Sequence, residues 1–356
     1  MTRTFFITGG LGFIGSAVVR HLMTQTDARI VVYDAMTYAA MPDAVEGASA
    51  SERYVFEQGD VRDADRLKSV LATHQPDTIM HLAAETHVDR SIDGPDAFIQ
   101  SNIVGTYTLL QAARVYYDTL SDEARARFRF HHISTDEVFG SLTGEDAAFS
   151  ETTRYDPRSP YSASKAASDH LVRAWGETFR LPIVLSNCSN NYGPWQYPEK
   201  LIPVMISLGL DGKPLPVYGS GENVRDWLHV DDHAQALVLI ATRGRLGESY
   251  NVGGDCERTN LEVVHAVCDQ LDKRAPKAKS HRDLISFVTD RPGHDFRYAI
   301  DHGKLTHELG WTPSHTFEQG LGETVDWYLD HQDWWRSILG KDGAAPRLGL
   351  GQKAAS

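Results

Sequence analysis

The sequence predicts an α/β protein with a doubly wound parallel sheet, followed by a smaller α/β region. Three observations favour this fold class. Short β-branched or apolar runs alternate with longer helical runs over residues 1–195, a glycine-rich turn follows the first run, and the chain has 356 residues. A chain of this length is typical of about two domains.

The first elements set the pattern for the rest. Residues 4–8 (TFFIT) and 29–33 (RIVVY) are the β-branched and aromatic runs of buried strands, and residues 13–24 between them have helical periodicity. Further strands are predicted at 54–58, 78–82, 128–134 and 182–186, and further helices at 63–74, 95–117 and 160–179. Strands alternating with helices in this way predict parallel strands covered by helices on both faces.

After about residue 195 the alternation weakens and prolines become frequent, at positions 194, 198, 203, 214 and 216. We expect a dinucleotide-binding domain at 1–195 and a substrate domain at 196–340, with interleaved segments. Residues 227–240 are predicted to form a helix that returns to the first domain, which then also includes about 226–245. Residues 341–356, rich in Gly, Ala and Lys, are expected to form a flexible tail.

Composition excludes several classes of protein. Apolar residues make up 41% and charged residues 23%, which is typical of a globular chain. With 35 Lys and Arg against 48 Asp and Glu, the net charge is −13, so we expect neither a nucleic-acid partner nor an anionic membrane surface.

The three cysteines, at 188, 256 and 268, form neither a CxxC pair nor an even-numbered framework, so we expect no metal site and no disulfide scaffold. The chain shows neither a signal peptide nor a run of 18 apolar residues. These features together predict a cytoplasmic protein without a membrane segment.

The glycine-rich turn places Gly9, Gly12 and Gly15 directly after the first predicted strand and at the start of the first helix. Glycines at such a turn let the backbone approach a pyrophosphate, which the helix N-terminus then faces. A plain tight turn is the alternative. Asp34, at the end of the second strand, suits a ribose hydroxyl and would repel a 2′-phosphate, so NAD is favoured over NADP.

Two more segments follow strands at the same edge of the sheet. Asp60 and Val61 come after the third strand, and Leu82, Ala83 and Ala84 come after the fourth. Small side chains there would let the backbone lie against a dinucleotide. Asp60 could equally cap the helix that begins near residue 64.

Tyr161 and Lys165 lie four residues apart on one face at the start of a predicted helix. A neighbouring cation favours the phenolate that an alcohol-oxidising base requires. The alternative is a surface tyrosine with a solvated lysine. Leu171, Trp175 and Phe179 form an apolar stripe on this helix, which is typical of a core or a subunit interface.

Thr135, Asp136 and Glu137 end a strand at the same sheet edge. Thr135 could hydrogen-bond a reacting hydroxyl, and two adjacent acids can divide acid and base roles. A capping pair for a turn is the alternative. Neighbours on a strand point to opposite faces, so both acids reach one substrate only if the chain has already turned.

These motifs resemble the extended short-chain dehydrogenase/reductases that act on nucleotide sugars, and among them the dTDP-glucose 4,6-dehydratases. The similarity extends over roughly residues 3–335, including NNYGP at 190–194, PEKLIP at 198–203 and RPGHD at 291–295. The Thr-Asp-Glu string separates this family from 4-epimerases, which lack the acid pair, and from GDP-mannose dehydratases, which resemble Thr-Ser-Glu.

The resemblance implies a bound NAD and conversion of dTDP-glucose to dTDP-4-keto-6-deoxyglucose. Tyr161 beside Lys165 would take the 4-hydroxyl proton, and Thr135 would bind the oxygen at C4. Glu137 would remove the C5 proton, and protonated Asp136 would release the 6-hydroxyl as water.

The resemblance also implies the binding residues. For the cofactor they are Gly9, Gly12, Phe13, Ile14, Gly15, Asp34, Thr37, Asp60, Val61, Leu82, Ala83, Ala84, Thr86, Ser101, Tyr161, Lys165 and Asn191. For the nucleotide sugar they are Thr86, Thr135, Asn190, Lys200, Leu201, Pro216, Val217, Tyr218, Arg225, Asn260, Asp290, Arg291 and His294, with the two arginines on the pyrophosphate. His229 stands where the family commonly has tyrosine.

Three alternatives remain open: another pyrimidine-nucleotide-sugar 4,6-dehydratase, a 4-epimerase, and a non-catalytic NAD sensor. A sensor predicts loss of Tyr161, Lys165 or the acids, all of which are present. By resemblance we expect a homodimer formed through the helices at 95–117 and 160–179.

Overall fold

The computed structural model describes residues 2–291 and 293–342. Its central element is a parallel seven-stranded sheet with the strand order β10-β6-β5-β4-β1-β2-β3. The strands are β1 (Thr4–Thr8), β2 (Arg29–Asp34), β3 (Tyr54–Gln58), β4 (Thr78–His81), β5 (Arg129–Thr135), β6 (Ile183–Cys188) and β10 (Ser249–Val252). The chain winds outward from β1 in both directions, so the switch point lies between β1 and β4. The predicted doubly wound fold is confirmed.

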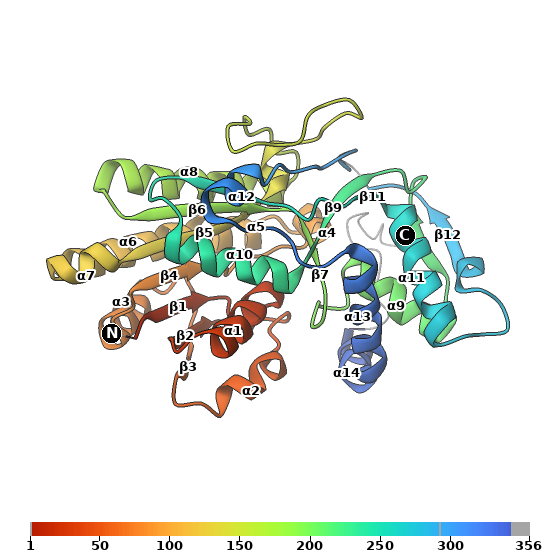
Figure 1. Ribbon diagram of the computed structural model, residues 1–356, viewed down its shortest axis with the longest axis horizontal. Helices are drawn as coiled ribbons and strands as arrows, with labels where there is room; N and C mark the ends of the chain where they lie inside the picture. Colours follow the sequence, from red (N-terminus) through yellow and green to blue (C-terminus); the bar gives the residue numbers. More distant parts are fainter. Residues whose placement is uncertain (1, 292, 343–356) are drawn as a thin grey trace, which may run out of the picture.

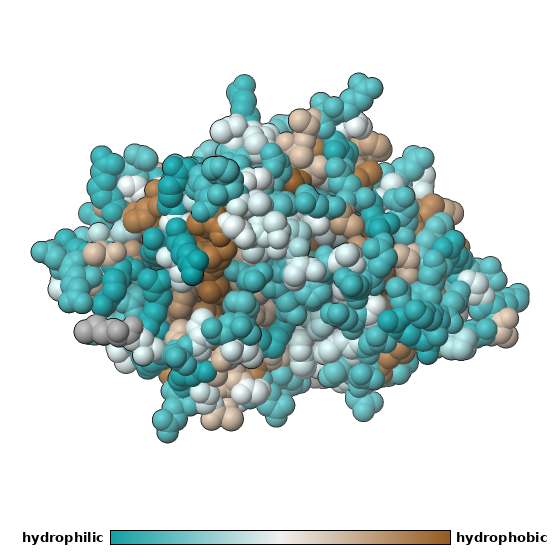
Figure 2. Space-filling view, viewed as in Figure 1, coloured by the Kyte–Doolittle hydropathy of each residue, from teal (hydrophilic) through white to brown (hydrophobic). Residues whose placement is uncertain are grey.

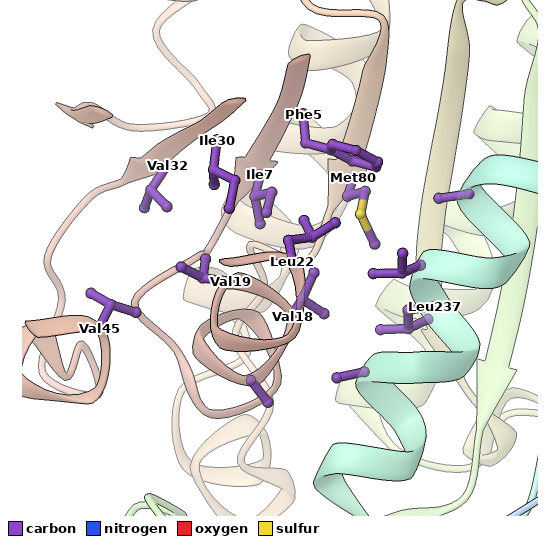
Figure 3. Packing of buried hydrophobic residues seen from close by; sticks show 14 of the residues in the cluster. Phe5, Ile7, Val18, Val19, Leu22, Ile30, Val32, Val45, Met80 and Leu237 are labelled. Carbon is purple, nitrogen blue, oxygen red and sulfur yellow. The ribbon is translucent and has the colours of Figure 1, made fainter. Parts of the chain in front are cut away.

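Helices cover both faces of this sheet (Figure 1). On one face, α1 (Phe13–Gln25) and α10 (Val230–Arg243) bury Phe5 and Ile7 of β1 together with Leu237 (Figure 3). On the other face, α3 (Ala64–His74), α6 (Thr106–Thr119) and α8 (Pro160–Phe179) pack over the cluster that contains Phe6. Because alternate residues of a strand point to opposite faces, one short run feeds two cores.

The C-terminal part has two small sheets, β11-β9-β7 and β12-β8. Their strands are β7 (Asn190–Tyr192), β8 (Leu215–Tyr218), β9 (Val224–His229), β11 (Glu257–Thr259) and β12 (Ile285–Val288). Four helices gather around them on the right of Figure 1: α9 (Leu201–Asp211), α11 (Asn260–Arg274), α13 (Phe317–Asp330) and α14 (Gln332–Asp342). They share a third apolar cluster that includes Ile206, Leu271, Leu321 and Trp335.

Shorter helical elements connect these parts. They are η1 (Pro42–Val45), α2 (Glu46–Ser49), α4 (Val88–Asp93), α5 (Asp96–Phe98), η2 (Ile99–Gly105), α7 (Asp122–Arg127), η3 (Asp136–Phe139), η4 (His281–Leu284) and α12 (Gly303–Leu309). The face shown in Figure 2 is mostly hydrophilic, with apolar side chains in small separate groups.

Two predicted helices differ in the structure. Residues 227–229 are the end of β9, and α10 begins only at Val230, so the helix predicted at 227–240 was wrong at its start. The helix predicted at 95–117 is interrupted by η2, a π-helical stretch, between α5 and α6. There Asn102 leaves the helix pattern to bond the backbone of Glu85 and the hydroxyl of Ser164.

The domain boundaries expected from the sequence stay a prediction. The large sheet takes in β10 at residues 249–252, beyond the 226–245 stretch that was expected to return to it. Of the predicted tail, residues 341–342 end α14 and 343–356 lie outside the described residues. Within residues 2–291 and 293–342, no helix is long and apolar enough to cross a membrane.

Candidate active site

A crevice of about 570 Å³ runs along the carboxyl ends of the central strands. Every residue predicted to bind the cofactor lies on its wall. The catalytic candidates Thr135, Asp136, Glu137, Tyr161 and Lys165 line it too, as do Asn190 and Lys200 from the predicted substrate group. The structure thus brings together two groups of residues that were singled out on separate sequence motifs.

The glycine-rich turn leaves no room for side chains. A Cβ on Gly15 would lie 2.1 Å from the carbonyl oxygen of Gly9, and one on Gly9, whose φ is +70°, would lie 2.6 Å from the nitrogen of Ala83. Gly12 is the N-cap of α1, and no described side chain caps this helix end. An uncapped N-terminus behind a close-packed glycine turn fits a pyrophosphate, as a dinucleotide such as NAD requires.

Asp34 lies at the carboxyl end of β2 and is 8% exposed. Its two carboxylate oxygens accept hydrogen bonds from the backbone nitrogens of Leu11 (3.0 Å) and Met36 (2.8 Å). Each oxygen keeps a second lone pair toward the crevice, which suits ribose hydroxyl donors. Burial raises the pKa of the Asp34 carboxyl, and the two backbone bonds oppose that shift.

Asp60 is not a helix cap. It accepts three hydrogen bonds from the guanidinium of Arg62, with the closest contact at 2.6 Å, and a fourth from the Arg62 backbone. The N-cap of α3 is Asp63, which accepts from the Arg66 nitrogen at 3.0 Å. Asp60 therefore holds Arg62 at the crevice wall, and the capping alternative was wrong.

The acid pair lies just where the strand geometry changes. β5 ends at Thr135 and η3 begins at Asp136, so both acids can line the crevice although they are adjacent in the sequence. The hydroxyl of Thr135 supplies the cap of η3 by accepting from the Glu137 nitrogen at 3.3 Å. The interpretation of the two acids as a capping pair is therefore not supported.

The two acids differ in their surroundings. Asp136 is 1% exposed, and its Oδ2 has no hydrogen-bond partner among the described residues. Burial, followed by the charge of Glu137, raises the pKa of Asp136 well above its ordinary value. Burial also raises the pKa of Glu137, but Arg291, Arg225 and Lys200 oppose it. This asymmetry favours a protonated Asp136 beside an ionised Glu137.

Tyr161 and Lys165 are both buried in the first turns of α8, which excludes the surface alternative. The Lys165 ammonium donates to the carbonyl of Ile133 at 2.8 Å. Burial, and then the charge of Glu137, raises the pKa of Tyr161 well above 10, while a hydrogen bond with Thr135 lowers it. No cation of the described residues is among the main groups that shift the pKa of Tyr161, so the lowering expected from Lys165 is not observed.

The C-terminal part carries four further substrate candidates, Tyr218, Asp290, Arg291 and His294. They are not on the crevice wall, although the charge of Arg291 opposes the rise in the pKa of Glu137. Arg291 Nη1 and Tyr218 Oη both donate to Asp89 of α4, at 3.1 and 3.2 Å. The Nδ1 atom of His294 lies 2.7 Å from the carboxylate of Asp290. These residues form one hydrogen-bonded group across the two halves of the chain.

Arg225 is held differently. It is 5% exposed, donates to the backbone carbonyls of Asp295 (2.9 Å) and Val224 (2.6 Å), and lies 4.2 Å from the ring centre of Tyr298. The positive charge of Arg225 opposes the rise in the pKa of Glu137. Two of its guanidinium nitrogens, however, already donate to backbone carbonyls. A bidentate contact to a pyrophosphate would require these bonds to change.

Besides Tyr218, Arg225, Asp290, Arg291 and His294, four more substrate candidates lie off the crevice wall in the described part of the chain: Leu201, Pro216, Val217 and Asn260. Val217 is 1% exposed and packs in the apolar cluster of the C-terminal helices. Asn260 begins α11 and donates its backbone nitrogen to the carbonyl of Asn223. Their assignment to a thymidine pocket stays a prediction.

Sequence reasoning missed several residues of the site. Glu85, Cys188 and Glu199 line the crevice, and Asp89 receives both Arg291 and Tyr218. Glu85 and Glu199 adjoin predicted site residues, so their position was a usable signal. Asp89 lies on a short helix, α4, that no periodicity predicted, and its role depends on partners far away in the sequence.

Taken together, a doubly wound sheet with a dinucleotide crevice, a buried Tyr-x-x-x-Lys pair and a Thr-Asp-Glu string that lines the crevice define an extended short-chain dehydrogenase/reductase. Comparisons with known proteins agree. The sequence model of the family described as GDP-mannose 4,6 dehydratase matches residues 6–324.

Relatives narrow the class further. The chain is 56% identical to the dTDP-glucose 4,6-dehydratase of Shigella flexneri, covering 93% of this chain and 94% of that one. It is 55% identical to dTDP-glucose 4,6-dehydratase 1 of Escherichia coli K12, covering 95% of each. The chain belongs to the dTDP-glucose 4,6-dehydratase family, so the family resemblance found in the sequence is confirmed.

Solved structures show the same relationship. The dTDP-glucose 4,6-dehydratase DesIV of Streptomyces venezuelae, crystallised with NAD and TYD bound, is 41% identical and has a TM-score of 0.87 over 94% of this chain and 99% of that one. The NAD complex of a UDP-glucose 4-epimerase from Thermus thermophilus is 28% identical, with a TM-score of 0.80 over 92% of this chain and 99% of that one. Because epimerases share the fold, the fold by itself does not select the reaction.

Proposed function

We propose that this protein dehydrates dTDP-glucose to dTDP-4-keto-6-deoxyglucose with a bound NAD. The observation that carries the proposal is the acid pair of buried Asp136 and half-buried Glu137 in the same crevice as Tyr161 and Lys165. A 4-epimerase needs the tyrosine and lysine, but loss of water also requires an acid and a base.

Bound NAD would supply the hydride acceptor for C4 of the sugar, the hydride donor for C6, and, in its oxidised form, a positively charged nicotinamide. Gly9, Gly12 and the N-terminus of α1 would hold its pyrophosphate, and Asp34 its ribose. The chain's own groups supply the proton transfers.

Oxidation at C4 requires removal of a hydroxyl proton. Tyr161 takes this proton, and Thr135, whose hydroxyl already bonds with Tyr161, holds the oxygen at C4. Because burial opposes the phenolate, the Lys165 ammonium and the positively charged nicotinamide would have to stabilise it.

Loss of water follows from the new ketone, which acidifies the proton on C5. Glu137 removes that proton, since Arg291, Arg225 and Lys200 oppose the rise of its pKa. Asp136 stays protonated because burial raises its pKa. It gives this proton to the 6-hydroxyl, which then departs as water.

The nucleotide would bind on the C-terminal side of the crevice. Arg291 and Arg225 are the cations for its pyrophosphate, and His294 lies next to Asp290 in the same group. Asn190 and Lys200 line the crevice nearer the sugar.

The test is the product. Incubation with dTDP-glucose, followed by NMR of the sugar, should show a 6-methyl group and a 4-ketone. Formation of dTDP-galactose would overturn the proposal in favour of an epimerase. Comparing the turnover of dTDP-, UDP- and CDP-glucose tests which nucleobase the enzyme prefers. We expect the thymine nucleotide to be converted fastest.

We also infer a homodimer. Tyr107 and Val115 on α6 and Phe179 on α8 are 45%, 52% and 37% exposed, and these two helices pack together. Such apolar side chains on adjacent helices favour contact with a second copy. Sedimentation should give twice the chain mass, and Val115→Lys should shift the chain toward the monomer.

The three cysteines are free thiols, which supports a cytoplasmic location.

A further inference from the structure

A cluster of metal-ligand side chains lies outside the crevice, where the start of α10 meets the start of α13. His229, His315 and Glu323 each offer one ligand atom, and these atoms lie within 4.8 Å of one another. His229 lies far from His315 and Glu323 in the sequence, so no local spacing motif joins all three. The expectation of no metal site rested on cysteine patterns and did not test this cluster.

His229 is a buried base with an unused nitrogen. It is 3% exposed, and its Nδ1 accepts from the Asp231 backbone nitrogen at 3.4 Å. Its Nε2 is buried and has no hydrogen-bond partner among the described residues. A buried nitrogen without a partner is costly. In the tautomer with its proton on Nδ1, which gives up the long contact with Asp231, Nε2 offers its lone pair to a metal ion.

His315 is already oriented as a ligand. Its Nδ1 lies 3.0 Å from Oδ2 of Asp232, whose other oxygen accepts from the Ser314 hydroxyl. Metal-bound imidazoles commonly donate their second nitrogen to a carboxylate in this way. The arrangement leaves Nε2 of His315 3.7 Å from Oε2 of Glu323. Two ligands about 2.1 Å from one tetrahedral zinc ion lie about 3.4 Å apart, so little movement is required.

The surroundings favour a cation. Three negatively charged carboxylates lie near the His315 ring, those of Asp232, Glu323 and Asp231. The two rings are stacked, with centroids 4.0 Å apart and planes 29° apart. Both lone pairs can meet at one ion only after the His229 ring turns, because a turn of His315 would break its contacts with Asp232 and Glu323.

We propose that His229, His315 and Glu323 form a binding site for a divalent transition-metal ion, of which Zn²⁺ suits two imidazoles and a carboxylate best. Solvent would complete the tetrahedral shell on the exposed side. The ion would link α10, which packs on the large sheet, to α13 in the C-terminal helices. This site does not depend on the proposed reaction.

The experiment is a calorimetric titration of ZnCl₂ into the full chain with NAD present, after chelator treatment. We expect one saturable site. His229→Tyr, which installs the residue common in the family, and Glu323→Gln should each weaken zinc binding at least about tenfold, and Asp232→Asn about 10–100-fold. His307→Gln removes an exposed histidine elsewhere and should bind zinc as the parent does.

Zinc binding of equal affinity in the parent, His229→Tyr and Glu323→Gln would overturn the proposal, as would a parent chain with no saturable site. The cluster would then be a stacked histidine pair only. Circular dichroism and NAD content check that His229→Tyr is folded. Glu323, whose side chain is 61% exposed, gives a second variant that leaves the core untouched.

Discussion

The two sides of the crevice are built in different ways. The N-terminal side consists of loops that directly follow β1, β2, β4 and β5, so its residues occupy one edge of one sheet. The C-terminal side draws Lys200, Arg225 and Arg291 from a loop, a short strand and a turn. Sheet topology places the first group, whereas tertiary contacts such as the Arg291–Asp89 pair place the second.

The two sides also differ in charge. The N-terminal side supplies the acids Asp136 and Glu137, and the C-terminal side supplies three cations that act on Glu137. A chain with a net charge of −13 can therefore bind an anionic nucleotide, because the cations are local to the crevice. We therefore expect substitutions on the N-terminal side of the crevice to lower kcat, and substitutions on the C-terminal side to raise KM for the nucleotide sugar.

The largest effect is expected for Glu137→Gln. The amide keeps the shape but cannot take the C5 proton, so turnover should fall about 10²–10⁴-fold. NMR of the product and deuterium exchange at C5 measure the loss. Glu145→Gln, an exposed acid in the same segment, should retain activity. Full C5 exchange in the Glu137 variant would contradict the assigned role.

Gly15→Ala tests the glycine turn on the same side. Its new Cβ would lie 2.1 Å from the Gly9 carbonyl, so the turn must shift, at a cost of about 1–3 kcal/mol of unfolding free energy. NAD content should fall with it. In Gly47→Ala the added Cβ meets nothing within 4 Å, and this helical site should be neutral or slightly stabilised. Urea unfolding compares them, and equal losses would argue against the close-packed turn.

Arg291→Ala tests the C-terminal side. Losing one charged donor to a phosphate costs about 1.5–3 kcal/mol, so KM for the nucleotide sugar should rise about 10–100-fold with a smaller change in kcat. Arg282→Ala is the matched control, since that arginine pairs with Asp269 at the surface. A change in kcat alone would break the proposed division between the two sides.

The same difference explains what the sequence could predict. Gly9, Asp34, Ala83 and Thr135 follow buried strands, so periodicity locates them and topology gathers them at one edge. Asp89 became visible only in the structure, because its partners Tyr218 and Arg291 come from loops of unpredicted path. The strand end at His229 was also missed, since a short apolar run does not distinguish a strand from a helix start.

The smallest effect concerns the pH dependence of stability at Asp136. Its pKa is raised in the folded chain, so the folded state keeps a proton that the unfolded state loses. Stability should therefore fall as pH rises from about 4 through the folded pKa, with a slope of at most about 1.4 kcal/mol per pH unit. Asp136→Asn removes this slope, so its stability relative to the parent should increase across that window.

The control residue, Asp146, should change stability with pH in the opposite direction. Asp146 is exposed, and its hydrogen bonds from Thr143 lower its pKa, so its contribution is present at neutral pH and lost on acidification. Asp146→Asn should thus lose stability relative to the parent above the ordinary carboxyl pKa and match it in acid. Urea unfolding over a pH series measures both variants. Parallel curves for Asp136→Asn and the parent would mean that Asp136 is ionised in the folded chain, and would remove the acid from the proposed mechanism.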